Sequence, residues 1–142
     1  MRTKILLPLA VLLLGISLPA QAEPTCSEYN PPEYRSRWNV HSHHVCRYPH
    51  ATLSAAYAEW RNWMVQVDGP KALLPKLPAR SRTVKPTDIE YEYGLREIVY
   101  TIAPDQVTVL ISEKDGESVY RFRLRDGYVE MHGTDSTNVE VY

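Results

Sequence analysis

Between residues 96 and 132 the chain alternates apolar and polar side chains and is interrupted by three turn sequences. These are Ala103-Pro104-Asp105, Asp115-Gly116 and Asp126-Gly127. Alternation with a period of two is typical of a half-buried strand, and Asp-Gly favours a two-residue hairpin turn. The sequence therefore predicts an antiparallel meander in this region.

The three turns also predict how the strands pair. Around Asp115-Gly116 the expected pairs include Ile111 with Tyr120 and Val109 with Phe122. The registers place one apolar set on the same face of the sheet: Ile98, Tyr100, Ile102, Val107, Val109, Ile111, Tyr120, Phe122, Leu124, Val129 and Met131. A slip by one residue would move a whole strand's set to the other face, so agreement between three turns supports the meander.

Residues 52–67 have apolar side chains at helical spacing. The stripe consists of Leu53, Ala56, Tyr57, Trp60, Met64 and Val67, and Trp63 widens it. Thr52 is suited to the N-cap, and Asp68-Gly69-Pro70 is a typical end signal. Because this stripe has to be buried, we expect the helix to pack on the apolar face of the meander.

Two more alternating stretches, 88–93 and 139–142, raise the expected number of strands to five or six. The predicted fold class is α+β, with one long helix packed across a curved antiparallel sheet in a single domain, 23–142. This plan resembles cystatin-like and NTF2-like folds by analogy of architecture alone. Residues 23–50 are expected to be irregular, with a short helical turn near 33–39, and residues 70–87 to form a Pro-rich basic linker.

The first 22 residues have the features of a secretory signal peptide. Arg2 and Lys4 precede an apolar run, and Ala20-Gln21-Ala22 is a small-x-small cleavage site. We expect cleavage after Ala22, export to the periplasm, and no transmembrane segment in the mature chain. Cys26 and Cys46 are the only cysteines, and in an oxidising compartment they are expected to form a disulfide.

Charge and motifs argue against several classes of protein. Without the signal peptide the chain has a net charge of about −3, whereas a nucleic-acid binder is expected to show a basic surplus. The sequence contains no nucleophile elbow, HExxH, phosphate loop or calcium loop. It therefore predicts neither an enzyme nor a cofactor.

The most distinctive polar surface is the predicted outer face of the sheet. The candidate binding residues there are Arg121, Arg123, Arg125, Tyr128, Glu130 and His132. The register across Asp126-Gly127 predicts that Arg123 faces Glu130, Arg121 faces His132 and Arg125 faces Tyr128. Arginine and tyrosine are enriched at the centres of protein interfaces. The leading hypothesis is a small exported protein that binds another protein, for example as an inhibitor or immunity-type protein.

Two other functions remain open at this point. His41, His43, His44 and His50 surround Cys46, and imidazole is a common zinc and copper ligand, so this stretch could bind a metal. Alternatively, a pocket between helix and sheet could hold a small molecule or an active site. Of the many tyrosines, Tyr57, Tyr100 and Tyr120 are expected in the core and Tyr48 on the surface.

Overall fold

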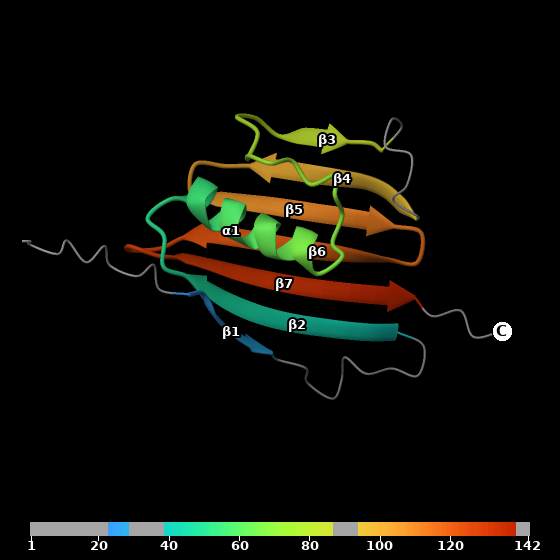
Figure 1. Ribbon diagram of the computed structural model, residues 1–142, viewed down its shortest axis with the longest axis horizontal. Helices are drawn as coiled ribbons and strands as arrows, with labels where there is room; N and C mark the ends of the chain where they lie inside the picture. Colours follow the sequence, from blue (N-terminus) through green and yellow to red (C-terminus); the bar gives the residue numbers. More distant parts are fainter. Residues whose placement is uncertain (1–22, 29–38, 87–93, 139–142) are drawn as a thin grey trace, which may run out of the picture.

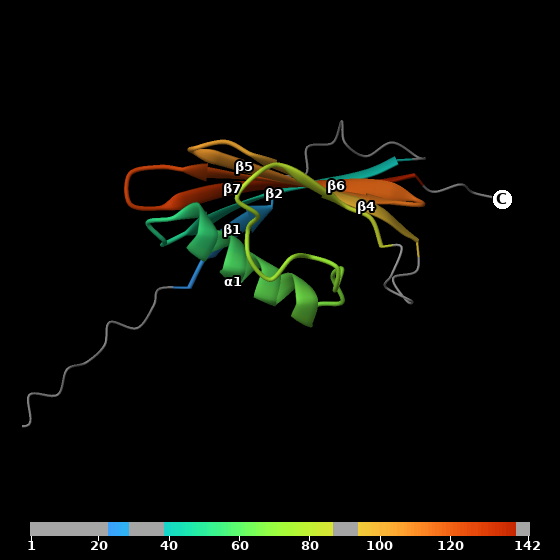
Figure 2. The same ribbon diagram turned by 90° about the horizontal axis from the view of Figure 1, so that it is seen from above.

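The computed structural model describes residues 23–28, 39–86 and 94–138 of the chain. It contains one helix, α1 (Leu53–Gln66), and seven strands: β1 (Thr25–Glu28), β2 (Asn39–Tyr48), β3 (Arg82–Val84), β4 (Leu95–Ile102), β5 (Gln106–Glu113), β6 (Gly116–Leu124) and β7 (Val129–Asn138). The strands form one antiparallel sheet in the order β1-β2-β7-β6-β5-β4-β3 (Figure 1). Helix α1 lies on one face of it (Figure 2), which confirms the predicted α+β architecture.

The meander is confirmed, and two of its three predicted registers are correct. Ile102 pairs with Val107 across the first turn, and Phe122 pairs with Met131 across the last. The middle register was wrong by two residues, because Lys114-Asp115 forms the loop and Val109 pairs with Tyr120. Asp115 and Gly116 do not have the positive φ that the expected turn requires. A register shift of two residues leaves every side chain on the same face of the sheet, so the predicted set of core residues is unaffected.

The sheet has more strands than predicted because two segments were misassigned. Most of the described residues in the segment 23–50 belong to strands β1 and β2. Strand β2 pairs with β7 along its whole length. The linker 70–87 contains β3, which pairs with β4. The predicted strands at 88–93 and 139–142, and the helical turn near 33–39, lie outside the described residues.

The ends of α1 follow the predicted signals. The hydroxyl of Thr52 accepts a hydrogen bond from the backbone N–H of Ala55 at 3.2 Å, as an N-cap does. At the other end Asp68 takes a positive φ of 62°, and the Gly69 N–H donates to the Met64 carbonyl at 2.6 Å. A Cβ at position 69 would collide with that carbonyl, so the close approach requires glycine.

The core lies between α1 and the central strands. Trp60 is completely buried, and its ring centroid is 4.7 Å from that of Tyr120 and 5.3 Å from that of Phe122. The predicted apolar face is buried apart from Leu124, which is exposed near the last turn, and Ile102, which is half-buried. Trp63, which the stripe included, is 53% exposed.

A buried tyrosine pair joins the helix, the sheet and the 70–81 loop. The Tyr57 hydroxyl donates to the Leu74 carbonyl at 2.6 Å, and the Leu74 N–H donates to the Tyr100 hydroxyl at 2.9 Å. The two hydroxyl oxygens are 2.8 Å apart, so Tyr100 must donate to Tyr57. Burial raises the pKa of both phenols, which keeps them neutral. Every polar atom of this buried group is therefore paired.

The predicted disulfide between Cys26 and Cys46 is present and joins β1 to β2. All four side chains of β1 are exposed, so this strand contributes little to the apolar core by itself. Within the described residues, no helix is long and apolar enough to cross a membrane.

Truncating Trp60 tests the packing of the helix on the sheet. Trp60→Ala is expected to lower the free energy of unfolding by about 3–5 kcal/mol, because it removes a fully buried aromatic side chain. Trp63→Ala is the matched control and is expected to cost less than about 1 kcal/mol, since its side chain is half exposed. Urea denaturation measures both. Equal costs would contradict the packing described here.

Thiol labelling of the denatured protein tests the disulfide. We expect no free thiol before reduction and two after it, because Cys26 and Cys46 are bonded to each other. Reduction is expected to destabilise the fold by about 3 kcal/mol, since it releases a loop with a sequence separation of 20 residues. Labelling of both cysteines without reductant would contradict the disulfide.

Candidate functional site

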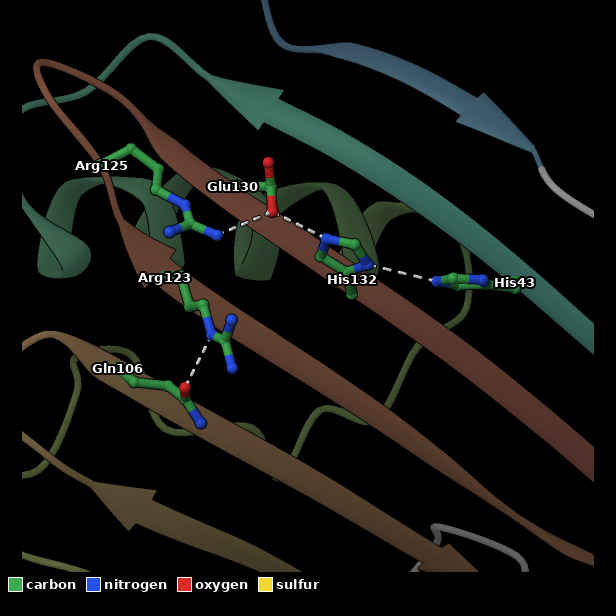
Figure 3. A network of polar contacts seen from close by, with 6 residues as sticks. All are labelled: His43, Gln106, Arg123, Arg125, Glu130 and His132. Carbon is green, nitrogen blue, oxygen red and sulfur yellow. Dashed lines mark hydrogen bonds and ion pairs between the residues drawn. The ribbon is translucent and has the colours of Figure 1, made fainter.

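The six candidate binding residues lie close together at the ends of β6 and β7, on the side of the sheet away from α1. The predicted cross-strand pairs are observed, with Arg123 opposite Glu130 and Arg121 opposite His132. The backbone N–H of Arg125 donates to the carbonyl of Tyr128 at 2.8 Å and closes the hairpin. We call the surface formed by these residues and His43 the basic outer face. Figure 3 shows Arg123, Arg125, Glu130, His132 and His43 on it.

A chain of hydrogen bonds crosses this face from β2 to the β6–β7 hairpin. His132 Nε2 donates to Glu130 Oε1 at 2.8 Å, and Arg125 Nη2 lies 3.5 Å from the same oxygen. His43 Nε2 is 3.3 Å from His132 Nδ1. With both rings neutral, His132 Nδ1 accepts, so His43 must donate. The hydrogen bond from His132 lowers the pKa of Glu130, which therefore stays ionised.

Two arginines beside this chain have no carboxylate partner among the described residues. Arg123 Nε donates at 2.9 Å to the neutral amide oxygen of Gln106, and Arg121 makes no ion pair within the described part of the chain. Both side chains are exposed. They border a hollow of about 340 Å³, whose other lining residues are His43, Val119, His132 and Thr134. The hollow is thus bordered by two permanent positive charges and two imidazoles.

Apolar and aromatic groups flank the hollow. Val99, Leu110 and Val119 pair in a row across β4, β5 and β6 and are half-buried. On the opposite side the guanidinium carbon of Arg47 lies 3.8 Å from the ring centroid of Tyr128. Figure 2 shows that no described element covers this face of the sheet.

Of the four histidines proposed as metal ligands, the three whose side chains the structure describes are not brought together. His43 and His44 are consecutive on β2 and point to opposite faces: His43 contacts His132, whereas His44 contacts Tyr120. His50 pairs with Glu59 on α1, and Cys46 is in the disulfide. The side chain of His41 lies outside the described part. Among the described residues, no group of three or more potential ligands could hold a metal ion.

A second candidate site, which the sequence analysis did not locate, lies on the helix side of the sheet. Figure 1 shows α1 over the middle of the sheet, beside β7, β2 and β1. A groove of about 740 Å³ lies there. Its lining includes Glu28, Ser42, His44, Cys46, Tyr48, Glu59, Trp60, Trp63, Met131 and Asp135. We call it the helix-side groove.

The polar wall of this groove depends on two strand pairings. Ser42 Oγ donates to Asp135 Oδ2 at 3.1 Å, and the Tyr120 hydroxyl donates to Asp135 Oδ1 at 3.3 Å. Next to them, the tip of the His44 imidazole would collide with a Cβ at position 133, so any larger residue there would have to displace the ring. Burial raises the pKa of Tyr120, and the Asp135 carboxylate raises it further.

The sequence analysis left open a pocket between helix and sheet, but it could not name the lining residues from β1 and β2, because residues 23–50 were expected to be irregular. Alternation of His44, Cys46 and Tyr48 was the available signal for a strand facing the helix. Tyr48 was expected on the surface and is instead 4% exposed, which corrects that prediction.

Comparisons of the chain with models of known protein families, with curated proteins and with solved structures found no match.

The basic outer face predicts a dependence of stability on pH. Burial, and then the neighbouring His132 and His44, lower the pKa of His43 below its ordinary value of 6.5. Below pH 6.5 the unfolded chain therefore binds more protons at this residue than the folded protein does, so stability falls as the pH falls.

Thermal unfolding between pH 8 and pH 5 measures this effect. His43→Gln is expected to reduce the loss of melting temperature below about pH 6.5, because the variant lacks the group that the fold keeps neutral. Glu130→Gln should leave that range largely unchanged, since a carboxyl with a lowered pKa titrates at lower pH. The same pH dependence in the His43 variant and the wild type would contradict the assignment.

Proposed function

We propose that this protein is a non-enzymatic binding protein whose basic outer face recognises an acidic segment of another protein. One observation carries the proposal. Arg121 and Arg123 border a hollow, and neither has a carboxylate partner among the described residues. Guanidinium groups suit carboxylates because their planar donors can form two parallel hydrogen bonds with them.

The surroundings of the hollow favour a protein partner. The row of Val99, Leu110 and Val119 offers apolar area beside the charges. Arg47 and Tyr128, already stacked, provide the residue types that interface centres favour. Nucleic acid is less suited, because the positive charge is local and the chain as a whole is slightly acidic.

A binding role also agrees better than catalysis with the state of Glu130 and His132. This pair could in principle exchange a proton. Its carboxylate, however, already accepts from His132 and Arg125, and the network lies on an open face that excludes no water. Catalytic sites usually gain strength from excluding water.

We infer that the protein acts after export. The first 22 residues have the pattern of a signal peptide, and a disulfide is typical of oxidising compartments such as the periplasm. An inhibitor or immunity-type role would suit a small protein with one charged docking face.

Charge reversal on the outer face tests the proposal. A fluorescently labelled hexaglutamate peptide is expected to bind the mature protein, with an affinity that falls as salt is added. Arg121→Glu combined with Arg123→Glu should weaken binding by at least about tenfold, since like charges repel across an interface. The melting temperature should change little, because both side chains are exposed.

Lys76→Glu combined with Arg80→Glu is the matched control. It makes the same change of net charge at two exposed positions of the 70–81 loop, and it should leave peptide binding nearly unchanged. If both double variants lost the same affinity for the peptide, a defined site on the outer face would be contradicted. Unchanged peptide affinity in the arginine double variant would contradict it as well.

A further inference from the structure

We propose that the hollow on the basic outer face binds a small organic phosphate, a monoester that carries its phosphoryl group on an apolar body. The hollow measures about 340 Å³, at the lower end of the range typical of small-molecule sites. This inference goes beyond the proposed function, because it names a second class of ligand and needs no protein partner. It shares Arg121 and Arg123 with that proposal.

Arg121 lies at the centre of the residues that line the hollow. It is directly opposite His132 in the pairing of β6 with β7, and the Cβ atoms of such pairs are about 5 Å apart. Arg123 and Val119 are two positions away along β6, about 7 Å in an extended strand, and they share its face. Thr134 is opposite Val119. The sheet therefore brings both guanidinium groups and a hydroxyl within reach of one small anion.

The two positive charges at the hollow are not compensated by a carboxylate. No aspartate or glutamate is present among its described lining residues. Glu130 is directly opposite Arg123 in the strand register, but it accepts from His132 at 2.8 Å and pairs with Arg125. Arg123 donates instead to the neutral amide of Gln106 (Figure 3). The nearest carboxylate on β7 is thus already paired, and the hollow keeps its positive charge.

A phosphate monoester matches this charge better than a carboxylate does. Above its second pKa of about 6 it carries two negative charges, one for each arginine. Its three terminal oxygens can accept hydrogen bonds from both guanidinium groups and from the Thr134 hydroxyl. A single carboxylate has one charge and two oxygens, so it would leave one arginine without a counter-ion.

Apolar side chains beside the charges would hold the body of the ester. Val119 lines the hollow, and Leu110 and Val99 follow it on the neighbouring strands β5 and β4. All three are half-buried, and no described element covers this face (Figure 2). An aryl or alkyl group attached to the phosphoryl oxygen would lie on this row and remove apolar surface from water.

Calorimetry with phenyl phosphate at pH 8 tests the proposal on the mature, oxidised protein. We expect saturable binding at one site, and in NMR spectra the backbone N–H signals of Arg121 and Thr134 should shift. Phenyl sulfate has the same shape but only one charge, and phenylacetate is a planar carboxylate of similar size. Both should bind at least about tenfold more weakly, because each lacks one charge-assisted contact. Inorganic phosphate, which lacks the phenyl ring, should bind about fivefold more weakly than the ester.

Two double variants locate the site. Arg121→Gln combined with Arg123→Gln should weaken binding of phenyl phosphate by at least about tenfold, because both charged donors are lost. Both side chains are exposed, so the fold should remain. Lys76→Gln combined with Arg80→Gln makes the same change of charge at exposed positions of the 70–81 loop, and it should bind like the wild type.

Gln106 provides a test that leaves both arginines in place. Gln106→Glu should weaken binding of phenyl phosphate by about fivefold, because it would give Arg123 a carboxylate partner. Gln106→Met removes the amide acceptor without adding a charge, and it should bind at least as tightly as the wild type.

Three outcomes would overturn the proposal. One is no saturable binding of phenyl phosphate, or binding that phenylacetate or phenyl sulfate equals. The second is unchanged affinity in the arginine double variant or in Gln106→Glu. The third is binding of a glycine-flanked phosphotyrosine peptide more than about tenfold tighter than that of phenyl phosphate, which would assign the hollow to a phosphorylated protein.

The hexaglutamate experiment distinguishes this inference from the proposed function. Failure of hexaglutamate to bind would contradict the acidic protein partner and leave the phosphate site standing. Equal binding of phenyl phosphate and phenylacetate would contradict the phosphate site and leave recognition of carboxylates standing.

Discussion

A single helix has to cover one face of a seven-stranded sheet. A helix with its side chains is about 10–12 Å wide, whereas neighbouring strands are about 4.8 Å apart, so α1 can cover only two or three strands. It lies against the middle of the sheet, with Trp60 on Tyr120 and Phe122. Toward β4 the 70–81 loop covers the apolar surface with Leu73, held by the Tyr57–Tyr100 pair. Toward β7, β2 and β1 no loop of the described residues does the same, and the helix-side groove is the space that results.

The alternation of side chains along each strand explains why residues of the basic outer face and of the helix-side groove lie so close together in sequence. Successive residues of a strand point to opposite faces. On β2, the ring of His43 therefore contacts His132 on the basic outer face, while the ring of His44 contacts Tyr120 on the helix side, and on β7, His132 and Asp135 are divided in the same way. The net charge, about −3 for residues 23–142, hides this division, because it adds arginines on one face to carboxylates on the other. Composition alone would describe neither surface.

The sequence predicted what depends on local patterns, and it failed where the pattern was interrupted. Alternation and the Asp126-Gly127 turn located β6 and β7 with the correct pairing, which placed Arg121 opposite His132 and Arg123 opposite Glu130. Histidine and other polar residues obscured the alternation along β2, and so the strand that pairs with β7 over its full length was missed. A pocket between helix and sheet was one alternative, but its lining could not be predicted, because Asp135, Ser42 and Trp63 come together only through pairing of segments far apart in the chain. Neither hydrophobic periodicity nor motif spacing contains that information.

The disulfide relates the stability of the fold to the groove. Strand β1 has four exposed residues and so gains little from burial, yet it contributes Cys26 and Glu28 to the groove lining. Its attachment to β2 consists of a short ladder and the bond to Cys46. A short edge strand without buried side chains is held weakly by backbone hydrogen bonds alone. The Cys26–Cys46 bond therefore holds one wall of the groove in place, and we expect reduction to loosen that wall. The opposite face, built on β6 and β7 in the centre of the sheet, does not depend on this bond.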